Sequence, residues 1–413
     1  MVMVMEKVQK LEEIIRLGAE LNSIHDVDIL LERILLEARK CVDADAGTIY
    51  IREGDDLVFS HSQNDTKQEK LPPGDKLIYT GFKIPINKSS IAGYVAETGT
   101  ILNIEDTYKI PSDADYSFGR KYDERTNYLT QSMLTVPLLS ETKAVIGVLQ
   151  IINRMGPDGK ITGFDAENEL FINHFASTAS MVLQRALMTR ALLLRMIDMA
   201  RLRDPKETGP HVNRVAAYAV EIYERWALSK GISRDKINED RDVLRMAAML
   251  HDVGKVGISD TILKKPAKLT EEEFNIMKTH TNIGGQLFQE RHSKFDEIAA
   301  IVAFTHHENW NGMGGYPGEV DMNTGEILKA DSQGNPLAKK GENIPIFGRI
   351  CAIADVYDAL SCKRVYKEAW SEEDVLKEIE KERGKKFDPD VVDAFFKSLD
   401  MIKSIATKYP NED

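Results

Sequence analysis

Five of the nine histidines in this 413-residue chain lie in short motifs of its second half, close to acidic residues. Two motifs hold adjacent pairs, His251-Asp252 and His306-His307. Imidazole and carboxylate groups together suit first-row transition metals such as iron, manganese or zinc. A fold of this half must therefore bring distant segments to one place. The candidate metal ligands are Glu207, His211, His251, Asp252, His280, His306, His307 and Asp355.

The number of candidate ligands predicts more than one metal ion. A lone histidine is more often an ordinary core or surface residue, but five in short motifs reverse that expectation. Asp355 lies in the apolar segment 349–360, where an unpaired buried carboxylate would be costly. Adjacent residues on a helix point about 100° apart, so His251 and Asp252 can serve two neighbouring metals, with Asp252 as the bridge. Clusters of two or three metals usually do hydrolytic phosphate chemistry.

Length and charge restrict the remaining classes. A chain of 413 residues predicts two or three domains. The net charge of −12 disfavours broad binding to a nucleic acid polymer. Three scattered cysteines disfavour a disulfide framework, and neither a signal peptide nor a membrane span is recognisable. We therefore expect a cytoplasmic protein that does not bind membranes.

The first half predicts an α+β domain. Apolar residues recur at helical spacing over 11–21 and 29–38, and residues 47–51 read as a strand with a hairpin partner at 57–59. Further strands are expected at 134–138 and 145–152. Two helices followed by a mixed antiparallel sheet resemble a GAF domain. The segments that carry the resemblance are ADAGTIYI at 44–51, SSIAGYVAETG at 89–99, SMLTVPLL at 132–139 and VIGVLQIINR at 145–154.

The resemblance implies a sensor domain over residues 1–167, and a small-molecule ligand that the sequence does not identify. GAF domains that bind cyclic nucleotides carry a signature that Asn153-Arg154 begins, but Ile161, Asp165 and Glu167 match its later part only approximately. The alternative is that these residues cap and brace the sheet.

A long helix is expected over 168–203, because Pro and Gly are absent from 168 to 199. Apolar residues recur every seven positions, which predicts a parallel homodimeric coiled coil coupling the two domains. The alternative is one long helix packed on its own domains. The predicted seam is Phe175, Ala179, Val182, Ala186, Thr189, Leu193, Met196 and Ala200, with Thr189 as its weak point.

Residues 204–413 predict an all-α domain with one long polar loop at 311–343. The motifs HDVGK at 251–255, HHENWNGMGGYP at 306–317 and IADVYDALSCKRVYK at 353–367 resemble an HD-GYP domain. This bacterial branch of the HD phosphohydrolases hydrolyses cyclic di-GMP. The resemblance implies cyclic di-GMP as substrate, pGpG or GMP as product, and iron or manganese as the metals.

The resemblance also distributes the ligands among the metals. His211, His251, Asp252 and Asp355 fit the general HD pattern. His280, His306 and His307 match the positions of a second metal site. Glu207 matches a position that supports a third metal in some members.

Substrate contacts are expected from Lys255, Arg364, Lys367 and Tyr316. Lys255 follows His251 by one helical turn and can place its ammonium on a phosphate, which makes it a candidate catalytic residue beside Asp252. The resemblance suggests that Arg364 and Lys367 hold the second phosphate or a guanine. Tyr316 and Trp310 either line the site or pack within the loop.

Two departures from the family pattern leave alternatives open. Asn311 stands where Asp is usual, and residues 319–343 look like an insertion after the GYP motif, which in the family also contacts partner proteins. The alternatives are a phosphodiesterase for cyclic GMP-AMP, a weakly catalytic receptor or interaction module, and a nucleotide phosphohydrolase of the wider HD group.

Overall fold

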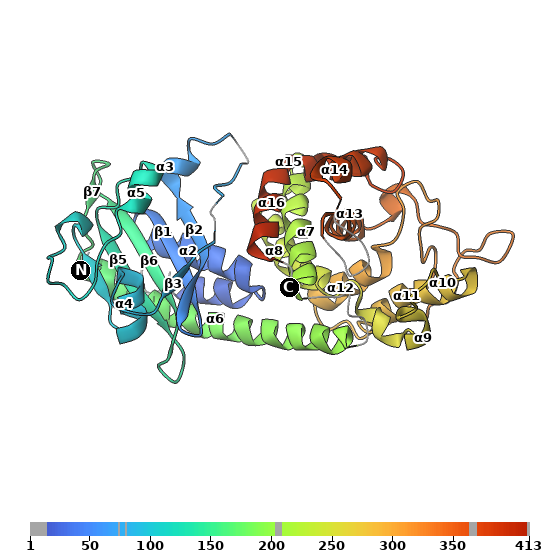
Figure 1. Cartoon of the computed structure of the whole chain (residues 1–413), viewed down its shortest axis with the longest axis horizontal. Helices are drawn as coiled ribbons and strands as arrows, with labels where there is room; N and C mark the ends of the chain where they lie inside the picture. Colours follow the sequence, from blue (N-terminus) through green and yellow to red (C-terminus); the bar gives the residue numbers. More distant parts are fainter. Residues whose placement is uncertain (1–14, 73–74, 79–80, 203–208, 363–369, 411–413) are drawn as a thin grey trace. The chain divides into compact units, whose positions relative to one another are not determined.

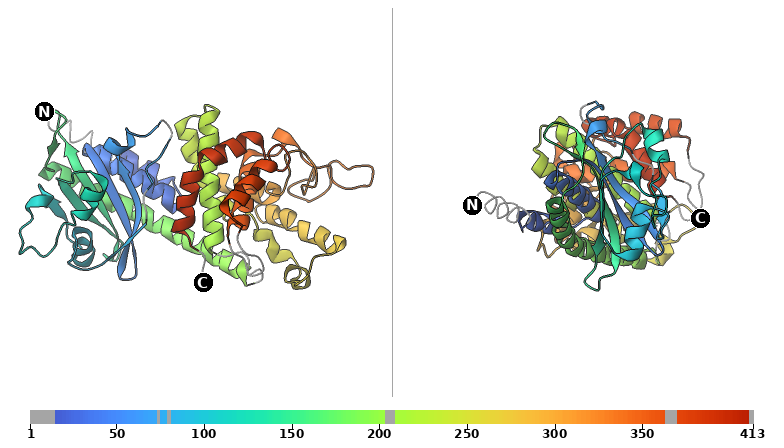
Figure 2. Two further views of the ribbon diagram at one scale, coloured as in Figure 1. Left: turned by 45° about the horizontal axis from the view of Figure 1, so that its top comes forward. Right: turned by 90° about the vertical axis from the view of Figure 1, so that its left-hand side faces the viewer.

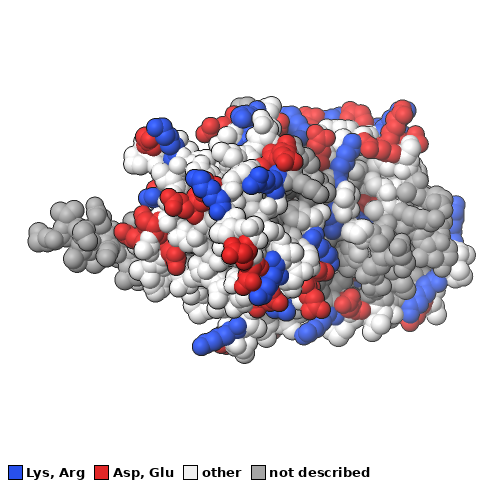
Figure 3. All heavy atoms as spheres, turned by 60° about the vertical axis from the view of Figure 1, so that its left-hand side comes forward, with Lys and Arg blue, Asp and Glu red and all other residues white. Residues whose placement is uncertain are grey.

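The computed structural model describes residues 15–72, 75–78, 81–202, 209–362 and 370–410. Contacts within the chain divide it into two compact units, Met1–Arg190 and Ala191–Asp413, which we call the first and second units (Figure 1). In the described part of the chain, no helix combines the length and the apolar character that crossing a membrane requires. Figure 3 shows Lys and Arg interspersed with Asp and Glu on the face that it displays.

The first unit is built on an antiparallel sheet of seven strands in the order β3-β2-β1-β6-β5-β4, with β7 paired to β6 (Figure 1). The predicted strands at 47–51, 57–59, 134–138 and 145–152 all lie within it. The strands are β1 (Ala44–Glu53), β2 (Asp56–Asn64), β3 (Lys83–Pro85), β4 (Leu102–Ile104), β5 (Met133–Leu139), β6 (Val145–Met155) and β7 (Ile161–Thr162).

Helices cover both faces of this sheet. Side chains of α2 (Val27–Cys41) and α6 (Ala166–Arg201) form one apolar core with the strands. On the other face, α4 (Ile91–Thr98) packs its buried residues against β1, β2 and β6. The end of α4 at Gly99 uses a left-handed backbone with φ of 68°, as its position after the helix predicts. The unit also contains the short helices α3 (Asp65–Gln68), η1 (Thr107–Lys109) and α5 (Lys121–Thr126), and a helix over the described residues 15–22.

The predicted coiled-coil seam on α6 needs correction. Phe175, Ala179, Val182 and Ala186 are at most 7% exposed, because they fill the core of the first unit. The seven-residue repeat is therefore an intrachain packing face over this stretch, as the alternative interpretation had it. A heptad stripe cannot distinguish a sheet from a second helix as its partner, since both demand the same spacing.

The second unit is helical, as predicted, and in its described residues the only β-pairing consists of isolated bridges (Figure 2). Apolar side chains of α7, α8, α12, α13 and α15 make one core. The helices are α7 (Gly209–Ser229), α8 (Arg234–Ala248), η2 (Val253–Gly257), α9 (Asp260–Leu263), α10 (Glu271–Lys278), α11 (His280–Gln286), α12 (Lys294–Thr305), α13 (Ile346–Ser361), α14 (Glu372–Lys381), α15 (Pro389–Lys397) and α16 (Leu399–Lys408).

Two glycines allow the close approaches that assemble the histidine motifs. A Cβ on Gly254 would lie 1.9 Å from the backbone oxygen of His280, so only glycine lets η2 meet α11 there. A Cβ on Gly348 would lie 2.0 Å from Thr305 Oγ1, so glycine also brings α13 against the end of α12. Both glycines lie in or near the motifs, and their role is to bring ligand-bearing segments together.

The insertion at 319–343 forms an irregular ribbon that extends from the helices (Figure 2). Two isolated bridges, Val320 to Ile327 and Ala330 to Pro336, hold it together. Asp321 and Asp331 each accept backbone hydrogen bonds at its turns. This segment was predicted as a long loop, and it has that character.

Candidate metal centre

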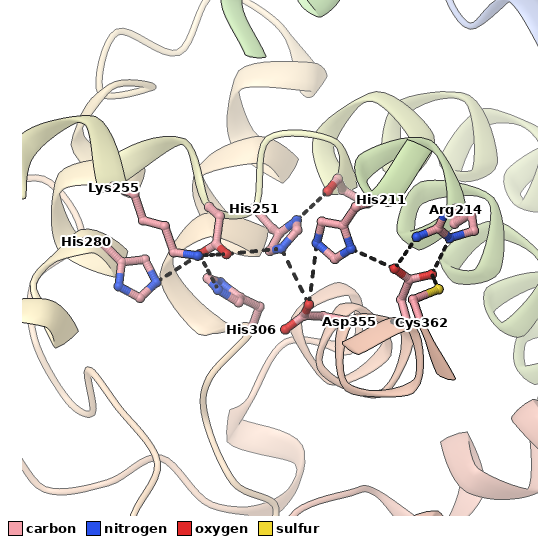
Figure 4. A network of polar contacts seen from close by, with 11 residues as sticks. His211, Arg214, His251, Lys255, His280, His306, Asp355 and Cys362 are labelled. Atoms are coloured by element: carbon pink, nitrogen blue, oxygen red, sulfur yellow. Dashed lines mark hydrogen bonds and ion pairs between the residues drawn. The ribbon is translucent and has the colours of Figure 1, made fainter. Parts of the chain in front are cut away.

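Seven of the eight predicted ligands gather in two neighbouring clusters. Figure 4 labels five of them, His211, His251, His280, His306 and Asp355. In each cluster, one ligand atom from every residue lies within 4.8 Å of the others. The first cluster is His211, His251 and Asp355, and the second is Asp252, His280, His306 and His307. The number of candidate ligands predicted more than one metal ion. The two clusters agree with this prediction, because they are consistent with a binuclear metal site.

Backbone carbonyls orient three of the histidines. Nδ1 of His251 donates to the carbonyl of Ala248 at 2.9 Å, and Nδ1 of His280 donates to that of Met277 at 2.7 Å. Nδ1 of His306 is 3.0 Å from the carbonyl of Val302. A carbonyl can only accept, so the proton is on Nδ1 and each neutral ring presents a lone pair on Nε2. This is the arrangement in which histidine binds a metal.

Asp252 belongs to the second cluster and also faces His251 of the first. Its Oδ1 is 3.1 Å from Nε2 of His280 and 3.4 Å from Nε2 of His306, while its Oδ2 is 3.4 Å from Nε2 of His251. These distances would suit ion pairs, but Asp252 Oδ1 and the Nε2 atoms of His280 and His306 have no hydrogen-bond partner among the described residues. Lone pairs that face one another in a buried site need a cation, so the residues fit a metal.

The protonation states agree with this reading. Burial lowers the pKa of His306, and it lowers that of His307 further, with His306 as the second cause. Burial alone would raise the pKa of Asp252, but Lys255 and His251 outweigh it and hold that pKa well below its usual value. His306 and His307 are thus neutral imidazoles beside an ionised carboxylate, which are the forms that bind metals.

Lys255 faces the same carboxylate. Its ammonium donates to Asp252 Oδ2 at 2.6 Å, and its side chain is 18% exposed (Figure 4). The predicted spacing of one turn from His251 thus places a positive charge beside the cluster. The ammonium lies where it can contact both the buried carboxylate and an incoming anion.

A second carboxylate on α13 positions the first cluster. Asp355 Oδ1 is 3.7 Å from Nε2 of His211. Asp358, one turn later, accepts from Nδ1 of His211 at 2.8 Å and from Nε of Arg214 at 2.6 Å. Sequence reasoning missed Asp358 and Arg214. The signal was their spacing, because each follows a predicted ligand by three residues on the same helical face.

The aromatic residues separate into two roles. The ring of Tyr316 is centred 4.8 Å from that of His307 and 6.2 Å from that of His280, so it lines the second cluster. Trp310 packs against the guanidinium of Arg349 at 5.5 Å, and its backbone nitrogen donates to Lys386. Trp310 is therefore loop packing. The remaining predicted residues, Glu207, Arg364 and Lys367, lie outside the described residues.

Glu308 is a further residue that the sequence did not single out. It is buried, and its Oε1 accepts from the backbone nitrogen of Gly318 at 2.6 Å. Burial raises its pKa to about 7. This hydrogen bond ties the histidine pair to the end of the GYP motif, so Glu308 positions Tyr316 relative to His307.

In the first unit, Asn153 has the bracing role that was the alternative to ligand binding. Its backbone φ is 56°, and its Oδ1 accepts from the nitrogen of Gln131 at 2.8 Å. Its Nδ2 donates to the carbonyl of Leu129 at 2.6 Å. Arg154 lies 3.6 Å from Asp165 across the β7 turn. These contacts hold the segment before β5 against β6.

Comparison with protein families identifies both halves. Residues 26–183 match the GAF domain, and residues 208–360 match the HD domain. Both matches agree with the resemblances that the motifs indicated.

The second half is similar to curated cyclic-dinucleotide phosphodiesterases of Vibrio cholerae serotype O1. A cyclic di-GMP phosphodiesterase is 40% identical over 52% of this chain and 41% of its own length. A probable cyclic di-GMP phosphodiesterase is 38% identical over 55% of this chain and 48% of its own length. A 3'3'-cGAMP-specific phosphodiesterase is 35% identical over 50% of this chain and 34% of its own length. The chain thus spans less than half the length of these relatives.

Proposed function

We propose that this chain, which carries a GAF domain followed by an HD domain of the HD-GYP kind, is a metal-dependent phosphodiesterase that hydrolyses cyclic di-GMP to pGpG, GMP or both. The observation that carries the proposal is the position of Asp252 between two histidine clusters. The similarity of the second half to cyclic-dinucleotide phosphodiesterases supports it.

A bound metal pair would activate water and neutralise the charge that develops on the phosphate. The ligand residues supply nitrogen and oxygen donors, which suit iron or manganese. Asp252 would be shared between the ions, since one of its oxygens faces each cluster. Tyr316 would exclude water from the side of the second cluster that it covers.

Lys255 is the proposed phosphate contact. Its ammonium neutralises Asp252 at 2.6 Å. With metal ions held by that carboxylate, the ammonium of Lys255 would be available to a phosphate oxygen without leaving a buried carboxylate uncompensated. Arg364 and Lys367 are proposed to hold the second phosphate or a guanine.

Cyclic GMP-AMP is the second candidate substrate, because one relative of similar identity is specific for it. Progress curves with each cyclic dinucleotide at equal concentration test the preference. The proposal expects a higher kcat/KM for cyclic di-GMP. A higher value for cyclic GMP-AMP would assign that substrate instead, and tight binding without turnover of either would assign a receptor.

Glu207 is proposed to hold a third metal beside His211. It precedes His211 by four residues in the sequence, and α7, which carries His211 in its first turn, begins at Gly209. Glu207→Ala should lower the metal count by one and slow the second cleavage more than the first. An unchanged count, checked by anomalous scattering, would favour two metals.

We also propose that the chain is a homodimer in which residues 168–203 couple a sensor over 1–167 to a catalytic domain over 204–413. The proposed seam is an exposed stripe of α6, offset from the buried one. Its spacings of seven, four and seven residues fit a coiled coil. It consists of Met181, Met188, Leu192 and Met199, which are 61%, 67%, 48% and 63% exposed.

Sedimentation of the full chain tests this seam. Met188→Lys with Leu192→Lys should convert a dimer to a monomer at micromolar concentration. Asn173→Lys is the control, since Asn173 is exposed on the same helix but lies about 80° around it from the stripe. A monomeric native chain would reject the proposal.

A further inference from the structure

An exposed aromatic residue stands on α10, next to the second cluster. Phe274 is 44% exposed, and none of the residues of α10 is buried. Core packing therefore does not explain the ring. Its ring is centred 6.2 Å from that of Tyr316, and the two planes stand at 84°. The two rings form a right-angled corner.

A positive charge lies over the same corner. The ammonium of Lys278 is 4.9 Å from the ring centroid of Phe274 and 5.9 Å from that of Tyr316. It donates to Oδ1 of Asn275 at 3.1 Å, which fixes its place on the helix. Phe274 and Lys278 are four residues apart, so they lie on one face of α10.

The corner continues the metal centre outward. Tyr316 contacts the rings of His307 and His280 on one side and that of Phe274 on the other. A phosphodiester held by the second cluster would therefore have its nucleoside beside this corner. A flat base that stacked on one ring would turn its edge toward the face of the other, and the ammonium of Lys278 would be available to its phosphate.

We propose that Phe274, Lys278 and Tyr316 form a stacking subsite for one purine base of the cyclic dinucleotide, an inference that rests on the proposed phosphodiesterase function. Aromatic side chains stack on nucleobases because every base has a π-face. The subsite therefore binds guanine and adenine alike. It contributes to affinity for a cyclic dinucleotide rather than to the choice between bases.

Steady-state kinetics of the metal-loaded full chain test the subsite. Removal of one stacked ring costs roughly 1–3 kcal/mol, about five- to 150-fold in binding. Phe274→Ala should raise KM for cyclic di-GMP and for cyclic GMP-AMP about tenfold each, with little change in kcat. Phe274→Trp should restore KM, whereas Phe274→Leu, which keeps apolar volume without a π-face, should not.

Two controls separate this subsite from the metal centre. Ile276→Ala should leave KM unchanged, since Ile276 is 47% exposed on the same helix but points to another side. Methyl p-nitrophenyl phosphate, a phosphodiester without a base, should be hydrolysed equally by native protein and Phe274→Ala.

Distinct outcomes would overturn the two proposals. An unchanged KM for cyclic dinucleotides in Phe274→Ala, or a parallel loss on the base-free phosphodiester, would overturn the stacking subsite. Native protein that is inactive on both cyclic dinucleotides but active on the base-free phosphodiester would overturn the proposed function instead.

Discussion

The two units bury polar side chains in opposite ways. In the first unit, Oδ1 of Asp45 accepts from Thr66, and Oδ2 accepts from the hydroxyl of Tyr128 at 2.5 Å. In the second unit, Asp252 Oδ1 faces histidine nitrogens that carry lone pairs. The first arrangement is complete as a protein structure. The second is complete only with cations, and this difference locates the chemistry.

The largest expected effect follows from removal of the shared carboxylate. Asp252→Ala should lower turnover roughly 10³-fold or more, because both metals lose a ligand and the charge that holds them. Metal analysis and circular dichroism should show fewer ions in a chain that is still helical. Asp123→Asn in the first unit is the control, and it should keep the native metal content. Native-like rates in Asp252→Ala would contradict the mechanism.

Metal removal should affect the two units unequally. A ligand present at 100 times its Kd stabilises the folded form by about 2.7 kcal/mol. This lowers the equilibrium constant for local unfolding about 100-fold. Chelation should therefore speed amide hydrogen exchange in α11 and α12, whereas exchange in β1 and β6 should not change. Equal effects on both units would mean that the clusters do not hold the metals.

A smaller loss is expected at the carboxylate that orients His211. Asp358→Asn should weaken metal affinity or activity about 10- to 100-fold, because residues behind a ligand typically contribute that much. Asp240→Asn is the matched control, since Asp240 is also buried in the second unit but contacts Lys294 and Tyr223. Similar metal affinity in both variants would remove the positioning role of Asp358.

The smallest effect concerns stability and its pH dependence. Burial alone would raise the pKa of Asp240, but hydrogen bonds from Lys294 and Tyr223 leave it below its usual 3.8. A depressed pKa stabilises the folded state above the unfolded value, and this stability is lost as pH falls through the folded value. Asp240→Asn should therefore cost about 1–2 kcal/mol at pH 7 and progressively less below pH 4 in urea unfolding. A constant difference across pH would show that the charge is not responsible.

The sequence predicted much of this site because ligand types and motifs are local properties. The motifs around His211, His251, His280, His306 and Asp355 named seven of the residues that the fold brings together. The sequence could not reveal which atom faces the metals. That depends on carbonyls such as Ala248 and Met277, which every residue possesses.

The wrong coiled-coil seam and the open question about Trp310 have a common physical cause. The apolar repeat of Phe175 and Val182 fits a sheet as well as a second helix, and the chain itself supplies the sheet. Trp310 could have lined the site until Arg349 proved to be its partner. In both cases the side chain was interpreted correctly as a packing group, but its partner is determined by tertiary structure.

The central claim is that the buried polar cluster of the second unit is a metal centre that opens a cyclic dinucleotide. The most direct test counts metals and identifies products in one sample of the full chain incubated with cyclic di-GMP. We predict at least two transition-metal ions per chain and the time-dependent appearance of pGpG or GMP, both lost in Asp252→Ala. A metal-loaded chain that leaves cyclic di-GMP and cyclic GMP-AMP intact would contradict the account.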